Sequence, residues 1–121
     1  MRLVAEAKAD HQLDALNELV HDRWFDLRGA RHDPVSETFR ISFDPGVVPT
    51  AKRARFTPEH AHVLEVRNVR SVDMEDSEKV DTYDFNSLRY DDSASTVTIR
   101  TGIPLRLVLS VRSLDMAVLA P

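Results

Sequence analysis

Cysteine is absent from this sequence, and glycine occurs only three times, at Gly29, Gly46 and Gly102. Without thiols the chain can form no disulfide framework, thiolate zinc site, iron–sulfur cluster or cysteine nucleophile. The few glycines form no phosphate-binding loop or nucleotide fingerprint, and the motifs G-x-S-x-G and H-E-x-x-H do not occur. The sequence therefore supports no class of enzyme, and we expect a protein that has neither catalytic residues nor a cofactor.

Long apolar runs and an excess of positive charge are missing as well. The count of 16 Lys and Arg against 20 Asp and Glu leaves a net charge of −4, which provides no attraction for nucleic acid or an anionic membrane. Charged residues interrupt the N-terminal stretch MRLVAEAKADHQLD, and no 18-residue apolar run follows it. We expect a cytoplasmic protein whose partners are neither membranes nor nucleic acid.

What the sequence does contain is an internal repeat. Residues 66–74 (VRNVRSVDM) match residues 108–116 (VLSVRSLDM) at six of nine positions. A fainter match, at a larger offset, places residues 25–41 over residues 83–99. Because the two offsets differ, the first copy must hold extra residues. We therefore predict a single domain over 1–121, with one repeat unit at 25–74, an insertion within 44–59, and a second unit at 83–118.

Each unit has the pattern of a hairpin followed by a third strand. Apolar residues alternate in TFRISF and in TVTIRT, and each of these strands follows a stretch with turn chemistry, HDPVSE or DDSAS. The third strands, HVLEVRNV and LRLVLSV, then step by three between apolar positions, as at a β-bulge or a strand corner. Neither unit can bury its apolar face alone. We predict an α+β fold, mainly an antiparallel β-sandwich or flattened barrel of two quasi-equivalent three-stranded units, with one N-terminal helix.

The N-terminal segment differs from both units. Leu13, Leu16, Leu19 and Val20 recur at helical spacing, and Asp10 is a suitable N-cap. These residues predict a helix over about 10–22. Residues 2–9 could extend this helix or form a short strand, and their periodicity favours neither.

The strongest metal-binding pattern is formed by His60 and His62. Residues two apart on a strand point the same way and can share one ion. A third ligand is not visible in the sequence. A small metal-dependent enzyme that uses His60 and His62 is therefore an alternative to a protein without catalytic function.

The inserted segment carries the basic residues Lys52, Arg53 and Arg55 beside Phe56. A basic run with an aromatic residue can bind a nucleic-acid strand, although the net negative charge argues against this. Residues 73–84 supply six acidic side chains, and the two segments could attract each other across a subunit boundary. For these four residues we favour a contact in a homodimer or with a protein partner over nucleic acid, and an exposed loop without any partner is an equal alternative to both together.

Two further polar groups have both a structural and a functional interpretation. The repeated residues Arg70, Asp73, Arg112 and Asp115 could bind an anion as a cluster, or could hold the two strand bends in shape. In HDRWFD, residues 21–26, the histidine and the two aspartates could form an acid–base or metal site, or could simply end the helix. We favour the structural interpretation of both groups, because these residues recur with the repeat or lie at a predicted helix end.

The runs HDRWFD, RHDP, RISF, VRSVDMEDSEKVDTYDFNSLRYD and TGIPLRL together resemble small uncharacterised bacterial domains of unknown function. The His-Asp at a helix end before a strand is also similar to toxin-immunity-type β proteins. The resemblance covers most of the chain and implies no activity and no site residues.

These observations favour a non-enzymatic protein-binding or assembly module. We expect a homo-oligomer, with a dimer favoured, that recognises a protein partner through a sheet face, a sheet edge or the loop 44–60.

Overall fold

The computed structural model describes residues 1–46 and 61–121 of the chain. Within these ranges it contains one α-helix, α1 (Leu13–Val20), and two short 3-10 turns, at Asp10–Gln12 and Leu27–Gly29. The strands are β1 (Arg2–Ala7), β2 (Trp24–Asp26), β3 (Arg31–Asp33), β4 (Thr38–Phe43), β5 (His62–Val66), β6 (Val69–Glu75), β7 (Thr82–Asp91), β8 (Thr96–Thr101), β9 (Arg106–Val111) and β10 (Met116–Ala120). The structure confirms the predicted α+β fold, in which antiparallel sheet dominates and one helix lies near the N-terminus.

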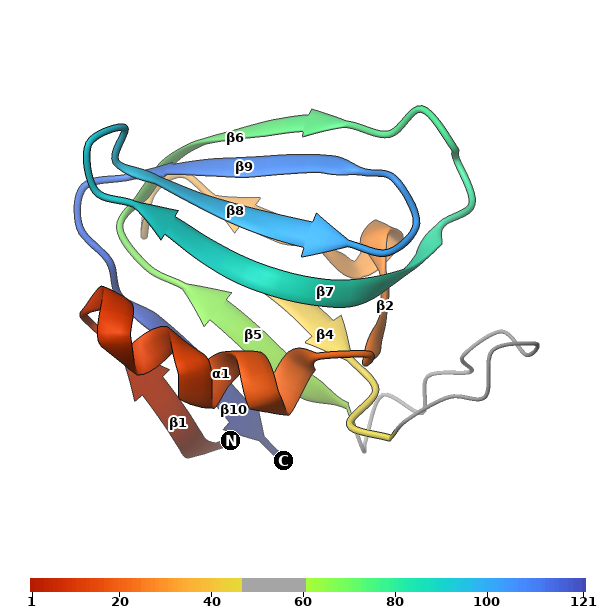
Figure 1. The fold of residues 1–121 in the computed structure, drawn as a ribbon, viewed down its shortest axis with the longest axis horizontal. Coiled ribbons are helices and arrows are strands. Elements are labelled where there is room, and N and C mark those ends of the chain that lie inside the picture. The colour runs from red at the N-terminus through yellow and green to blue at the C-terminus, as the bar shows by residue number, and fades with distance from the viewer. Residues whose placement is uncertain (47–60) are drawn as a thin grey trace.

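The strands form two layers (Figure 1). We call β1, β10, β5, β4 and β3 sheet A, and β7, β8, β9 and β6 sheet B. Strand β2 joins the sheets, because it pairs with β4 on one side and with β7 on the other. The path of hydrogen-bonded strands runs from β1 to β6 without closing, so the molecule is an open, flattened barrel.

The two sheets exchange strands. After β5 the chain crosses to sheet B, where β6 pairs with β9, and after β9 it crosses back to sheet A, where β10 pairs with β5. The first crossing, at Arg67 and Asn68, comes directly before the first VRS, where the ladder of β6 shifts register between Val69 and Ser71. The second crossing, at residues 112–115, begins with the Arg-Ser of the second copy. Besides strand β2, two connections of the chain therefore join the layers.

The hairpin turns before β4 and β8 have the same construction. The Oδ1 atoms of Asp33 and Asp91 accept the backbone N–H groups of the residues three positions later, Ser36 at 3.4 Å and Ala94 at 3.1 Å. Each turn ends on a residue with positive φ, Glu37 at 55° and Ser95 at 54°. The carbonyl oxygen of Glu37 accepts the N–H of Val69, and the carbonyl oxygen of Ser95 accepts the N–H of Val111.

The core fills the space between the layers, and its largest side chains gather where β2 joins them. Phe25, Phe43, Tyr83 and Phe85 are all 0–1% exposed. The ring of Phe25 lies 4.5 Å from that of Phe85 and 6.0 Å from that of Tyr83, measured between centroids. Aromatic rings at these separations attract one another beyond the effect of burial alone. The cluster therefore holds sheet A against sheet B.

The segments before β4 differ in detail from the sequence-based expectations. Residues 2–9, which periodicity left open, contain strand β1, and Asp10 begins a 3-10 turn rather than capping α1. The first part of the first repeat unit, which pairs with TFRISF in the expected hairpin, is divided into β2 and β3 by the turn Leu27–Gly29. The carboxylate of Asp26 accepts the backbone N–H of Arg28 at 2.9 Å, which favours this turn over a continuous strand.

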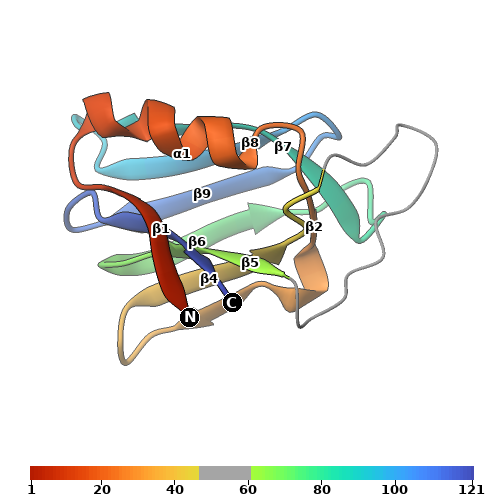
Figure 2. The same cartoon turned by 90° about the horizontal axis from the view of Figure 1, so that it is seen from below.

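Helix α1 runs along the side of the molecule between the two layers (Figures 1 and 2). It buries Leu13, Leu16 and Val20, three of the four positions that the helical spacing picked out, and the fourth, Leu19, is partly buried against the core. Its Asn17 side chain bonds to the backbone of β7 as a neighbouring strand would. The amide oxygen accepts the N–H of Leu88 at 2.6 Å, and the amide nitrogen donates to the carbonyl of Leu88 at 3.1 Å. The helix therefore satisfies backbone groups that would otherwise lack partners.

We expect Asn17→Ala to lower the free energy of unfolding by about 2 kcal/mol, because it leaves two part-buried backbone groups without partners. Urea unfolding followed by circular dichroism measures the change. Asp14→Ala, one turn earlier on the exposed side of the same helix, is the control, and its midpoint should stay close to that of wild type. Equal midpoints for the two variants would show that the Asn17 bonds contribute nothing.

Candidate functional site

The outer face of sheet A is the surface with the most unusual composition. Residues that alternate along its strands point in opposite directions, and those that point inward, such as Ile41, Leu64 and Val118, are fully buried. The outward-pointing residues form two rows across the sheet. The strand register aligns Leu3, Leu119, Val63 and Ser42 in one row, and Glu6, Ala117, Glu65, Arg40 and Arg31 in the other.

The first row is apolar over three strands. Leu3 is 52% exposed, and Leu119 and Val63 are half-buried beside it. Val4, the extra residue where β1 shifts register, adds a further exposed side chain. Single exposed apolar residues are ordinary, whereas a contiguous group on a solvent-facing sheet commonly marks a contact surface. We call Leu3, Val4, Val63 and Leu119 the apolar row.

A groove of about 800 Å³ lies next to the apolar row. Its floor is the outward-pointing side of β4, with Thr38, Arg40 and Ser42, and Val63 closes the end nearest the apolar row. The β3 side contributes Arg31 and Asp33, with Gly29, His32, Pro34 and Ser36 around them. The groove therefore combines charged, hydroxyl and apolar groups along one strand.

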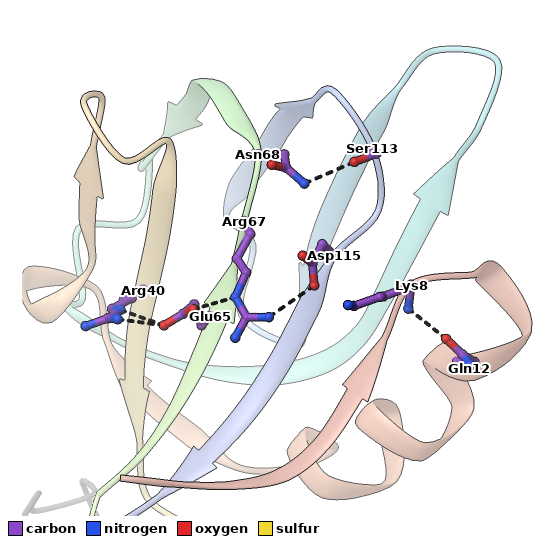
Figure 3. Close-up of polar contacts among 8 residues, drawn as sticks. All are labelled: Lys8, Gln12, Arg40, Glu65, Arg67, Asn68, Ser113 and Asp115. Atoms are coloured by element: carbon purple, nitrogen blue, oxygen red, sulfur yellow. Dashed lines mark hydrogen bonds and ion pairs between the residues drawn. The ribbon is translucent and has the colours of Figure 1, made fainter.

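A buried carboxylate lies beside the groove (Figure 3). The side chain of Glu65 is only 8% exposed, although it points to the outer face. Its Oε2 atom accepts Nε and Nη2 of Arg40, at 2.8 and 2.7 Å, and its Oε1 atom accepts Nε of Arg67 at 2.7 Å. Arg67 in turn donates through Nη1 to Asp115 at 3.2 Å. The four side chains form one continuous charged network from β4 across the end of β5 to the connection before β10.

The network keeps Glu65 ionised. Burial acts to raise the pKa of Glu65, but the hydrogen bond from Arg67 and the charges of both arginines outweigh it, and the pKa lies below the ordinary glutamate value. The hydrogen bond to Glu65 correspondingly raises the pKa of Arg67. Such a buried carboxylate is stable only because its lone pairs are satisfied, so its main effect is to fix the orientation of the two arginines.

Of the two predicted metal ligands, the structure describes only His62, so their meeting stays a prediction. His60 lies outside the described residues, and His62 begins β5 with its ring 5.8 Å from that of Phe43. The Nδ1 atom of His62 is buried and has no hydrogen-bond partner among the described residues. In residues 1–46 and 61–121, no three His, Asp or Glu side chains form a group that could hold a metal ion.

The predicted partner-binding residues Lys52, Arg53, Arg55 and Phe56 also lie outside the described residues. Their contact with a partner or with nucleic acid therefore stays a prediction.

The repeated quartet does not form a cluster. Three of its four members pair with residues outside it, in the ion pairs Asp73–Arg106, Arg112–Glu37 and Asp115–Arg67. Of the HDRWFD residues, His21, Asp22 and Arg23 line a hollow of about 500 Å³ at the end of α1. There Nδ1 of His21 lies 2.8 Å from the carbonyl oxygen of Asn86, and Nε2 lies 3.4 Å from Asp22. Both ring nitrogens thus have neighbours within the scaffold.

Sequence reasoning missed the Arg40–Glu65–Arg67 network. The alternation in HVLEV places Glu65 on the outer face, where a charged residue is ordinary, and nothing local indicates that it is buried. The partner arginines lie on another strand or beyond the strand end, and only the register between β4 and β5 brings them together.

Comparison with protein-family models, with curated proteins and with solved structures found no match for this chain. Functional inference therefore rests on the geometry of the described residues. None of the helices in those ranges combines the length and apolar character of a membrane span.

Proposed function

We propose that this protein is a non-enzymatic protein-binding module and that the outer face of sheet A is its binding surface. The observation that carries the proposal is the exposed apolar row of Leu3, Val4, Val63 and Leu119 beside a groove. Protein contact surfaces typically have an apolar centre and a polar rim, and this face has that arrangement.

The rigidity of the face supports the same proposal. Its strands belong to a continuous sheet, and the Arg40–Glu65–Arg67 network fixes the charged side chains at its centre. A surface that is already ordered loses little conformational entropy when a partner binds. Within the described residues, no observation of comparable weight favours the metal-dependent alternative.

Selection from a random-peptide phage library, with the immobilised protein as bait, tests the proposal. We expect enrichment of peptides that bind wild type and bind Leu119→Asp at least about tenfold more weakly, because the substitution places a charge in the centre of the contact. The control is Val108→Asp, which makes the same change at a half-buried, outward-pointing position of sheet B. The control should leave peptide binding unchanged, and thermal unfolding of both variants verifies that they fold.

Light scattering of the same samples tests the homodimer predicted from the sequence. A mass of twice 13.7 kDa for wild type, reduced to a monomer by Leu119→Asp but not by Val108→Asp, would identify the partner on this face as a second copy of the chain. The proposed function would be contradicted if no peptide were enriched and the mass did not depend on Leu119.

A further inference from the structure

Arg31, on the β3 side of the groove, is held in place by the backbone. Its Nη1 atom donates to two carbonyl oxygens, those of Arg28 at 2.5 Å and Ala30 at 2.8 Å. Both hydrogens of Nη1 are therefore used. A guanidinium has five N–H donors in a planar fork, so the edge formed by Nε and Nη2 remains for a ligand. This edge has the spacing that a carboxylate accepts with both of its oxygens.

Arg40 is the partner of Arg31 in the strand register, and one nitrogen of its guanidinium is available to a ligand. Its Nε and Nη2 atoms donate to Glu65, which leaves Nη1 without a partner among the described residues. Two like charges opposite each other on neighbouring strands destabilise a sheet unless something compensates them. Glu65 compensates Arg40, but the part of the chain that the structure describes supplies no acidic partner for Arg31 in an ion pair.

The other titratable groups of the groove are already engaged. Oδ1 of Asp33 accepts the N–H of Val35 at 2.9 Å, and this bond lowers the pKa of the Asp33 carboxyl. Asp33 sits two residues from Arg31, at the hairpin end. The His32 ring lies within hydrogen-bonding distance of the Val69 carbonyl through Nε2, at 3.1 Å. Neither residue occupies the free edge of Arg31.

We propose that the groove binds a carboxylate of an acidic peptide segment, with the Nε/Nη2 edge of Arg31 and Nη1 of Arg40 as its donors. This inference rests on the proposed function and names the partner class: an extended segment of a protein partner that carries Asp or Glu close to an aliphatic residue. The carboxylate binds between the two arginines, and the aliphatic residue lies on Val63 and the apolar row, away from the negative charge of Asp33.

The length of the groove favours a peptide over a small anion. Thr38, Arg40 and Ser42 point to the same side of β4, and they span about 14 Å at the usual rise of an extended strand. An extended peptide laid beside them can offer backbone groups to the two hydroxyls and a side chain to each end of the groove. The pre-set orientation of both guanidiniums reduces the entropy lost on binding.

The peptides enriched on wild-type protein test this inference. We expect them to share an acidic residue near an aliphatic one, and to bind Arg31→Ala at least about tenfold more weakly, because a charge-assisted hydrogen-bonded pair is lost. Arg31→Lys should recover only part of the affinity, since an ammonium group cannot present two parallel donors. Fluorescence anisotropy with one enriched peptide, and with the same peptide carrying Asn or Gln in place of the acid, provides the measurement.

Arg89→Ala is the matched control. Arg89 occupies the corresponding position in the second hairpin, at an exposed position of β7, and it does not line the groove. Binding by Arg89→Ala should equal that of wild type. Peptides that depend on Leu119 but not on Arg31 or on their own acid would overturn the inference and leave the proposed function standing. A homodimer through the apolar row that excludes all peptides would also overturn the inference and leave the proposed function standing. If the protein bound no peptide and formed no Leu119-dependent dimer, both the inference and the proposed function would be overturned.

Discussion

Phe25→Ala is expected to lower the free energy of unfolding by about 3–5 kcal/mol, the largest effect of any single substitution considered for this protein. Phe25 is fully buried, and its ring contacts those of Tyr83 and Phe85. Its strand β2 is also the one that pairs with both β4 and β7. Truncation therefore opens a cavity at the junction of the two layers. Since small domains have total stabilities of about 5–15 kcal/mol, the variant should be close to unfolding.

Urea unfolding of Phe25→Ala and Phe25→Leu measures this effect. Phe25→Leu retains most of the apolar volume, so it should cost clearly less and guarantee a folded variant for comparison. Trp24→Leu, at the neighbouring half-buried position on the same strand, is the control for a general loss of β2 and should also cost less. A cost for Phe25→Ala no greater than that for Trp24→Leu would mean that the aromatic cluster does not hold the layers together.

Glu65→Gln should produce the second-largest loss, about 2–3 kcal/mol at neutral pH. Removing one partner of a buried ion pair commonly costs about 3–5 kcal/mol. Here the remaining arginines can be hydrated in part, because the side chains of Arg40 and Arg67 are 61% and 35% exposed, and this reduces the cost. Asp73→Asn breaks the exposed ion pair with Arg106 and serves as the control, with an unfolding midpoint that should not move measurably.

The pH dependence of the Glu65→Gln effect follows from the direction of the pKa change. The pKa of Glu65 in the folded protein lies below its unfolded value of about 4.3, so the unfolded chain takes up the proton first as the pH falls. The stabilisation is therefore complete above about pH 5 and is lost as the pH falls through the folded value. Urea midpoints across this range should show a constant gap between wild type and Glu65→Gln that narrows only in acid. A gap that is the same at every pH would exclude the ionised carboxylate as its cause.

Particular residues show how far the sequence predicts this fold. The alternation of Phe39, Ile41 and Phe43 correctly placed β4 and its buried side, because burial of one face of a strand imposes a period of two. The spacing of Leu13, Leu16 and Val20 similarly placed α1 and its buried face. The sequence could not place the 3-10 turn after β2, because it depends on one local side-chain contact, between Asp26 and Arg28.

The candidate site was beyond sequence reasoning for a different reason. His60, His62 and the basic residues of the insertion attracted attention because they are adjacent in the sequence. The residues of the groove and its network come from β3, β4, β5 and the connection to β10, and each is unremarkable in its own segment. Arg31 has special importance only because Arg40 stands opposite it and because two carbonyl groups hold its side chain.

The sequence by itself determined the class of the fold, the positions of most strands and the inward-pointing residues, since these follow from periodic burial along short segments. Tertiary structure alone decided the order of the strands, the exchange of β6 and β10 between the sheets, and the neighbours of each outward-pointing residue. The physical reason is that strand register is set by packing and hydrogen bonding between segments far apart in the chain. The apolar row and the Arg31–Arg40 groove are products of that register, and the function proposed for this protein depends on both.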